Sequence, residues 1–454
     1  MDIGFETIGN ATLICHDKVP MLVTDPWITG SAYFGSWTRS HEIPAEQLES
    51  IKRCKFVWIS HGHPDHLSDD SIALLKEKKF LLPDHVGNRI FDSLKNQGFD
   101  VAILKSREWI SLSDRIRILC VADYNQDGIL LVDLNGTLIV NLNDASDCGW
   151  RRFVRKIVRG YDVSFLLKLT GYGDAEMIHF FDEDGRFVPP RAAKKEPVGR
   201  QISHLTAQYG AKYFVPFSSM HRYQRADSIW PNEYTTTLED YRNGFDSTHC
   251  ELLPAFIRYD CSKESLESID PPKTSPQVFA PAQFGDDWSE PLSTDDKAKI
   301  TAYFQSFDHV KNQFRFVRIT VGGKTHIIDM NARVRDRGIT FEATRHSLML
   351  AIEQEIFDDM LIGNFMKTML HGGHGKRPLY PDFTPFVAKY GDNGRAKNYQ
   401  ELDAYFAEYR KRSPIDYFYK QFENRSVGII RRLMPLDSRA YTLARKIYYR
   451  VKEI

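Results

Sequence analysis

The 454-residue sequence lacks several features that would assign its class directly. Its six cysteines include no C-x-x-C pair, which argues against a disulfide scaffold, a zinc ribbon and an iron–sulfur centre and favours a reducing compartment. No apolar run approaches the roughly 20 residues that span a bilayer. The N-terminus carries no basic region followed by an apolar stretch, so we expect no signal peptide. These absences favour a cytoplasmic protein.

Neither sign of charge is in excess, because 60 Lys and Arg balance 60 Asp and Glu. No overall field therefore points to nucleic acid or to a membrane, and we expect neither a nucleic-acid partner nor a transmembrane segment. The basic C-terminus leaves peripheral contact with an acidic membrane surface open, although docking within the molecule fits its aromatic and aliphatic residues equally well.

The chain is too long for one ordinary core and predicts roughly two or three domains. Strand-like and helix-like segments interleave in the first half, and Asn135-Gly136 between two apolar runs is the strongest hairpin signal. A second hairpin is predicted around Gly322-Gly323, followed by one amphipathic helix at Ser347–Leu361. The expected parts are a catalytic α/β domain (1–265), a Pro-rich linker (266–299), a small α+β domain (300–400) and a basic helical segment (401–454).

One short loop concentrates metal-binding side chains. It follows an apolar run at 55–59 that predicts a buried strand, and Ser68-Asp69-Asp70 after it indicates a helix start. Residues two apart in an extended loop point to the same side, so His61 and His63 can bind one ion. Asp65 and His66 then turn toward a second ion. Imidazole and carboxylate ligands suit Zn, Fe or Mn. We expect a metal site at His61, His63, Asp65 and His66 rather than a polar loop with chance histidines.

This motif, together with Thr24-Asp25-Pro26-Trp27 upstream, resembles the metallo-β-lactamase superfamily over roughly residues 1–225. The resemblance implies an αββα sandwich with the metal site at one edge between two sheets. It implies the four loop ligands, a bridging carboxylate at Asp144 after the predicted hairpin, and a ligand of the second metal at His221. It also implies that Asp65, His66 and Asp144 act in catalysis.

A closer likeness is to the metallo-β-lactamase part of the CMP-N-acetylneuraminate hydroxylases. The similar segments include Asp25–Gly30, His63–Ser68 and Phe357–Gly363. That family carries a Rieske cluster, and its C-x-H and C-x-x-H ligand pairs are absent here. Oxidative chemistry would therefore need electrons from a separate ferredoxin-type or Rieske-type protein.

A second departure concerns the third ligand of the first metal, normally histidine, which falls on Asp123. A carboxylate there makes the site harder and more anionic, which suits iron or manganese better than zinc. The alternative is that Asp123 only supports the site or its loop. We expect two divalent ions, with iron favoured and zinc or manganese as alternatives.

These patterns predict a metalloenzyme and leave its reaction open. Two ferrous ions with an external reductant would allow an oxygenase that hydroxylates an anionic substrate, such as a nucleotide sugar or a carrier-linked molecule. The alternatives are a hydrolase of an ester, thioester, amide or phosphodiester, and a non-catalytic metal-binding protein. Substrate contacts are expected from Tyr172 in a glycine-rich loop and from Arg151 and Arg155, unless these arginines only form a solvated helix face.

Overall fold

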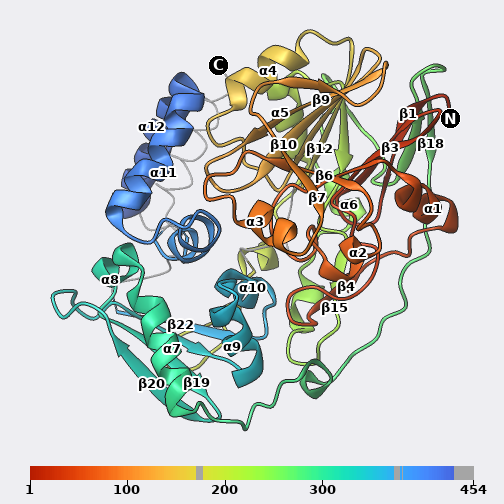
Figure 1. Ribbon diagram of the computed structural model, residues 1–454. Helices are drawn as coiled ribbons and strands as arrows, with labels where there is room; N and C mark the ends of the chain where they lie inside the picture. Colours follow the sequence, from red (N-terminus) through yellow and green to blue (C-terminus); the bar gives the residue numbers. More distant parts are fainter. Residues whose placement is uncertain (170–176, 373–378, 381, 434–454) are drawn as a thin grey trace.

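The computed structural model describes residues 1–169, 177–372, 379–380 and 382–433. Two large mixed sheets form the larger part of the molecule, at the upper right of Figure 1. The eight-stranded sheet has the order β18 (Ser265–Ser268), β17 (Ile257–Asp260), β1 (Ile3–Ile8), β2 (Thr12–Asp17), β3 (Val19–Thr24), β5 (Phe56–Trp58), β6 (Lys79–Pro83) and β7 (Asp100–Leu104). The seven-stranded sheet has the order β16 (Glu251–Leu252), β14 (Tyr213–Pro216), β12 (Val163–Lys168), β11 (Thr137–Asn143), β10 (Gly128–Leu134), β9 (Ile116–Ala122) and β8 (Trp109–Ser111).

The two sheets pack face to face. Their shared core contains residues of both, and the rings of Phe5 on β1 and Phe165 on β12 meet edge to face at 4.9 Å. Such an edge-to-face pair is favoured by the ring quadrupoles and adds to the burial of apolar area.

Helices cover both outer faces of this pair of sheets. On the first sheet lie α1 (Ala45–Arg53), α2 (Asp69–Ala73) and α3 (Arg89–Asn96), and their apolar residues share one core with β3 and β5. On the second sheet, α4 (Arg151–Val158), α5 (Gly199–Tyr209) and α6 (Leu238–Arg242) share a core with β10 and β11. The predicted αββα sandwich is therefore confirmed.

The predicted hairpin at Asn135-Gly136 is confirmed. The strands β10 and β11 pair antiparallel with Leu134 opposite Thr137, which leaves these two residues as the turn. Both have positive φ, 51° and 97°, as a type I′ turn requires. The hairpin positions a predicted metal ligand, because β11 runs directly into Asp144.

A third, five-stranded sheet forms the smaller part of the molecule, at the lower left of Figure 1. Its order is β13 (Phe180–Phe181), β22 (Lys367–His371), β21 (Gly338–Glu342), β19 (Phe316–Val321) and β20 (Lys324–Asp329). The predicted turn at Gly322-Gly323 joins β19 to β20. An aromatic-rich core joins this sheet to α7 (Thr294–Gln305), α8 (Asp308–Gln313), α9 (Arg345–Glu353) and α10 (Phe357–Ile362).

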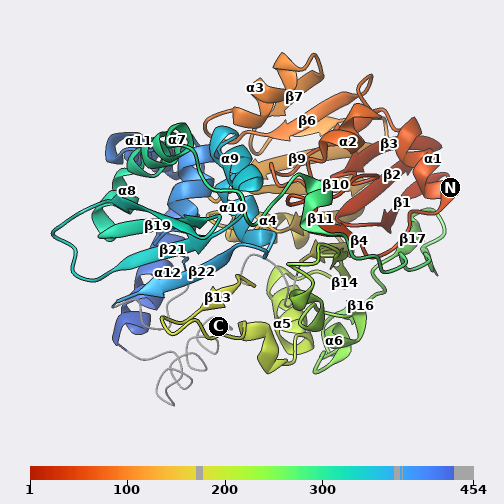
Figure 2. The same cartoon turned by 90° about the horizontal axis from the view of Figure 1, so that it is seen from below.

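The single helix predicted at Ser347–Leu361 is wrong, because the structure divides it into α9 and α10. Glu355 between them has a φ of 51°, in the left-handed region that ends helices. The apolar spacing continues across the break, so periodicity alone did not indicate it. The break turns α10 toward the two large sheets, as Figure 2 shows.

The remaining elements are short segments and two C-terminal helices. The helices α11 (Tyr399–Arg412) and α12 (Pro414–Leu433) follow η4 (Pro385–Asn393) and lie beside the larger part of the molecule. A two-stranded ladder joins β4 (Trp37–Arg39) to β15 (His221–Tyr223). Three short helical turns are η1 (Arg191–Lys194), η2 (Trp230–Glu233) and η3 (Pro281–Phe284).

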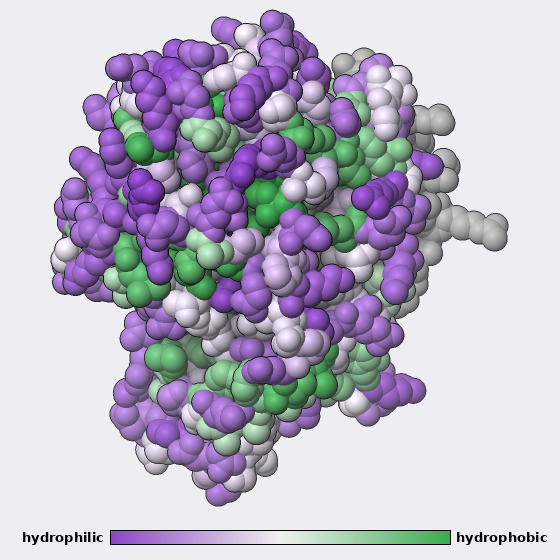
Figure 3. All heavy atoms as spheres, turned by 90° about the vertical axis from the view of Figure 1, so that its right-hand side faces the viewer, coloured by the Kyte–Doolittle hydropathy of each residue, from purple (hydrophilic) through white to green (hydrophobic). Residues whose placement is uncertain are grey.

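No helix among the described residues is long and apolar enough to cross a membrane. Figure 3 shows hydrophobic residues in small patches among hydrophilic ones on one face, with a narrowing between the larger and the smaller part of the molecule.

A buried carboxylate on β1 gives the fold an acid-sensitive contact. Burial alone would raise the pKa of Glu6, but hydrogen bonds from His16, Gln47 and Arg258 lower this pKa to about 2. Since the unfolded-state pKa is about 4.3, this carboxylate stabilises the fold above that pH and the contribution is lost as the pH falls toward 2. We expect Glu6→Gln to flatten the pH dependence of the unfolding free energy between pH 4.3 and 2, by up to about 1.4 kcal/mol per pH unit.

Urea unfolding at several pH values in this range measures that slope. The matched control is Glu46→Gln, which removes an exposed carboxylate bound to the same Arg258. An unchanged slope in Glu6→Gln would contradict the assignment.

Candidate metal centre

The predicted metal loop, residues 59–68, leaves the end of β5 and enters α2. It makes a tight turn in which the backbone N–H of His66 donates to the carbonyl of His63 at 3.0 Å. Ser68 then caps α2 by accepting from the N–H of Ser71. His61, Asp65 and His66 are buried at 3%, 2% and 0% exposure, so the loop faces inward. The local signals in the sequence therefore correspond to a loop that buries all three side chains.

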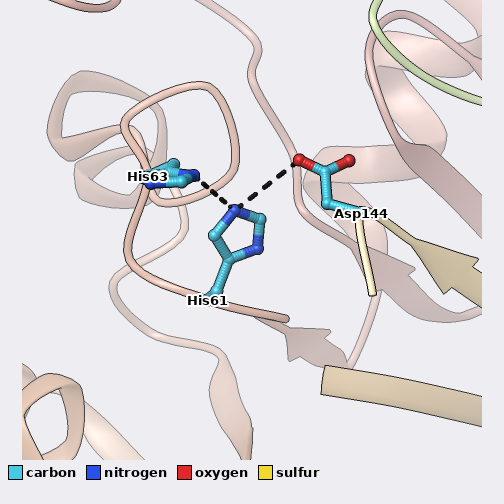
Figure 4. Close-up of side chains that lie close together, drawn as sticks. All are labelled: His61, His63 and Asp144. Carbon is cyan, nitrogen blue, oxygen red and sulfur yellow. Dashed lines mark hydrogen bonds and ion pairs between the residues drawn. The ribbon is translucent and has the colours of Figure 1, made fainter. Parts of the chain in front are cut away.

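Three predicted ligands form one tight group, shown in Figure 4. His61 Nε2 lies 2.8 Å from His63 Nδ1 and 3.8 Å from Asp144 Oδ2. Asp144 follows β11, so the group joins the loop after β5 to the exit of the hairpin. Two imidazole nitrogens and one carboxylate oxygen within 4.8 Å of one another are a donor set that suits a divalent cation.

One ring nitrogen of His66 contacts Asp25 and Asn143, and the other lies near Asp144. Its Nδ1 lies 3.3 Å from Asp25 Oδ2 and 3.0 Å from Asn143 Nδ2. Its Nε2 lies 3.2 Å from Asp65 Oδ2 and 3.5 Å from Asp144 Oδ2, yet it is buried without a hydrogen-bond partner. A nitrogen in this position is a candidate ligand.

Asp65 is fixed by two polar side chains. Tyr33 donates its hydroxyl to Oδ1 at 2.6 Å, and Asn10 donates its amide to Oδ2 at 3.0 Å. Although burial opposes ionisation, the charge of His66 and the hydrogen bond from Tyr33 lower the pKa of Asp65. The carboxylate is therefore held ionised in a buried place.

His221 lies on β15 with its ring stacked on Trp37 at 3.4 Å and an interplanar angle of 5°. Both ring nitrogens are buried and lack a hydrogen-bond partner. Burial lowers the pKa of this imidazole to about 3, opposed only by the charge of Asp65, so the ring is neutral. A neutral buried imidazole with unpaired nitrogens is the form that binds metal. Like His66 Nε2, these nitrogens have the chemistry of metal ligands, but neither residue belongs to a group of ligand atoms within 4.8 Å of one another among the described residues.

Asp123 lies at the end of β9 and is fully buried. Its Oδ1 accepts from the backbone N–H groups of Asn125 and Asp127, whereas its Oδ2 has no partner. Its carboxylate belongs to neither group of ligand atoms within 4.8 Å of one another among the described residues. Burial and the charge of Asp127 raise the pKa of Asp123 to about 8. Its assignment as a ligand stays a prediction.

The expected substrate residues lie on α4 or outside the described residues. Arg151 forms an ion pair with Asp147 at 2.9 Å. Arg155, one turn later, has a buried Nε without a partner. Tyr172 lies outside the described residues. Substrate contact by any of the three stays a prediction.

Two carboxylates with no role expected from the sequence lie beside His63. Asp358 Oδ2 on α10 is 3.0 Å from His63 Nε2, and Asp359 joins these two residues in a second group within 4.8 Å. The sequence segment around them stood out only by resemblance. Acidic residues in a first helical turn are common because they stabilise the helix dipole, so their type gave no signal. Lys389 on η4 is a further neighbour of the centre, 3.4 Å from Asp127 Oδ1.

Comparison with known proteins adds a family likeness. No family model matches the chain. It is 31% identical over 137 residues to the cytidine monophosphate-N-acetylneuraminic acid hydroxylase of Asterias rubens, a match that covers 28% of this chain and 20% of the relative. The predicted resemblance is confirmed. The matched stretch spans only about a fifth of that relative's length, so its activity does not carry over as a finding.

Two solved structures show more distant likenesses. Igni18, a metallo hydrolase from Ignicoccus hospitalis, has a TM-score of 0.37 and 12% identity, covering 59% of this chain and 99% of its own. CmlA, a diiron beta-hydroxylase from Streptomyces venezuelae, has a TM-score of 0.36 and 13% identity, covering 57% and 54%. Neither likeness bears on the reaction of this chain.

Proposed function

We propose that the protein is a dinuclear metalloenzyme that hydroxylates an anionic small molecule with electrons from a separate electron-transfer protein. The observation that supports this most is the sequence similarity to hydroxylases, in a chain whose metal loop buries the side chains of His61, Asp65 and His66. The proposed ligands are imidazoles and carboxylates, without a thiolate. Such a donor set suits iron.

The proposed ligands divide between two ions. His61, His63 and Asp144 would hold the first ion; Asp65, His66 and His221 would hold the second, with Asp144 shared between them. Two ferrous ions bound there would supply redox-active Lewis acids at which dioxygen is reduced. With two external electrons and two protons, one oxygen atom would enter a substrate C–H bond and the other would leave as water.

Neighbouring side chains hold the proposed ligands in place. Trp37 covers one face of His221, and Tyr33 packs edge to face on Trp37 at 4.5 Å. This aromatic pair is buried beside His221, while the Tyr33 hydroxyl orients Asp65. Asp25 and Asn143 hold His66 in the same way from behind. The chain thus fixes its ligands before an ion binds, which reduces the cost of ordering them.

A metal-dependent hydrolase is the second candidate. The same set of imidazole and carboxylate donors, with zinc or iron, would lower the pKa of a bound water without any reductant. Its substrate would be an ester, thioester, amide or phosphodiester. The two candidates differ in metal identity and in the need for electrons.

Metal analysis after purification without air separates them. We expect about two iron ions per chain, as a dinuclear site requires, and consumption of oxygen only when a reductant is supplied. The matched control is the His61→Ala/His63→Ala double variant, which should lose the first iron ion and, with it, the oxygen consumption. Two zinc ions per chain with hydrolysis of an ester or phosphodiester in the absence of reductant would contradict the hydroxylase and support the hydrolase.

A further inference from the structure

The helix α10 brings a carboxylate from the C-terminal part of the chain to the metal loop, 295 residues away in sequence. It lies on the side of the third sheet that faces the two large sheets (Figures 1 and 2). Asp358 is 5% exposed, and its Oδ2 is 3.0 Å from His63 Nε2. The contact is therefore enclosed, where a hydrogen bond is stronger than in water.

Both ends of α10 are anchored to the larger part of the molecule. Before the helix, Arg89 at the start of α3 donates to the backbone carbonyls of Gln354 and Glu355. After it, Ser36 donates to the carbonyl of Gly363, and Asn364 donates to the hydroxyl of Tyr223 on β15. These contacts hold Asp358 at a fixed place relative to the metal loop.

The second nitrogen of the same imidazole points to the metal group. His63 Nδ1 faces His61 Nε2 at 2.8 Å, on the opposite side of the ring from Asp358. A carboxylate can only accept a hydrogen bond, so its position favours the tautomer with the proton on Nε2. That tautomer leaves the lone pair on Nδ1, which is the atom that would bind an ion.

We propose that Asp358 is the positioning residue of His63: it fixes the Nε2–H tautomer and the ring orientation, and through it the C-terminal part of the chain completes the metal centre. This inference rests on the proposed metal centre. In this proposal, α10 supplies the hydrogen-bond acceptor for His63 Nε2.

The adjacent Asp359 provides a matched comparison. It lies on the same helix with the same 5% exposure. Within the part of the chain that the structure describes, its carboxylate has no hydrogen bond or ion pair. Replacing Asp359 therefore separates two explanations for the pair of carboxylates beside His63. In the first, only Asp358 matters because it orients His63; in the second, both carboxylates bind a cation directly.

The test uses the full chain and Zn²⁺ as the probe, with affinity measured by competition with a chromophoric chelator. We expect Asp358→Ala to weaken zinc binding by about 10–100-fold, as loss of an outer hydrogen-bond partner of a ligand does. Asp358→Asn should lose less, because the amide oxygen can accept the same hydrogen bond. Asp359→Asn should bind zinc as the unaltered protein does.

The ring nitrogens give a readout that a general loss of stability would not produce. In zinc-loaded protein labelled with ¹⁵N-histidine, the His63 signals should show a protonated Nε2 and a metal-bound Nδ1, and Asp358→Ala should lose this pattern while the other histidine ligands keep theirs. Equal zinc affinity in Asp358→Ala, or an equal loss in Asp359→Asn, would overturn the inference. If the unaltered protein binds no zinc, manganese or ferrous iron, the proposed metal centre itself fails.

Discussion

Replacing Asp144 by alanine is expected to remove one metal ion from the chain and to weaken the binding of the other. Its Oδ2 lies 3.8 Å from His61 Nε2 and 3.5 Å from His66 Nε2, so this carboxylate stands between the two histidines assigned to different ions. Its Oδ1 accepts from Ser218, which fixes the orientation of the group. The loss of affinity should exceed the roughly 10–100-fold seen when only an outer partner of a ligand is removed.

Metal content after zinc loading and gel filtration measures the effect. The matched control is Asp133→Asn at the opposite end of the same hairpin, where the carboxylate binds Arg117 and Tyr161 instead. We expect the control to bind the same number of ions as the unaltered protein. Two tightly held zinc ions in Asp144→Ala would refute the bridging assignment and with it the dinuclear centre.

The part of the site that the sequence predicts is the part encoded locally. His61 and His63 are two residues apart after a strand, so extended-loop geometry alone turns both to one side. The hairpin turn at Asn135-Gly136 is similarly local, because few residue pairs accept positive φ at both turn positions. Asp144 and His221 needed the family resemblance, since no local pattern connects them to the loop.

The parts that the sequence does not predict depend on packing between distant segments. Asp358 reaches His63 only because the chain breaks at Glu355 and α10 turns toward the loop. Asp123 matches a ligand by its position in the chain, but local competition draws one of its oxygens to the backbone of Asn125 and Asp127, a common use of aspartate in turns. Position along a chain does not reveal which of these contacts a carboxylate makes.

A carboxylate behind the metal loop, Asp25, should be the most costly to remove from the fold. It lies at the end of β3 with no exposed surface. It accepts hydrogen bonds from the backbone N–H of Ser60 at 2.7 Å, the Ser60 hydroxyl at 2.8 Å and the Asn143 amide at 2.9 Å. Its Oδ2 also pairs with His66 Nδ1 at 3.3 Å. One side chain thus ties β3 to the metal loop and to the exit of β11.

Asp25→Ala would leave these buried donors without an acceptor and His66 without its partner. Breaking a buried pair of this kind costs about 3–5 kcal/mol in the free energy of unfolding. Urea unfolding of metal-free protein measures the cost without a contribution from bound ions. The control is Asp2→Ala, which removes a half-exposed partner of Arg115 and should cost far less, because solvent screens an exposed ion pair. Because Asp25 supports His66 and not the ion directly, Asp25→Asn, which retains one acceptor oxygen, should recover part of the stability. A loss no larger than that of Asp2→Ala would show that the loop is held by its own turn rather than by Asp25.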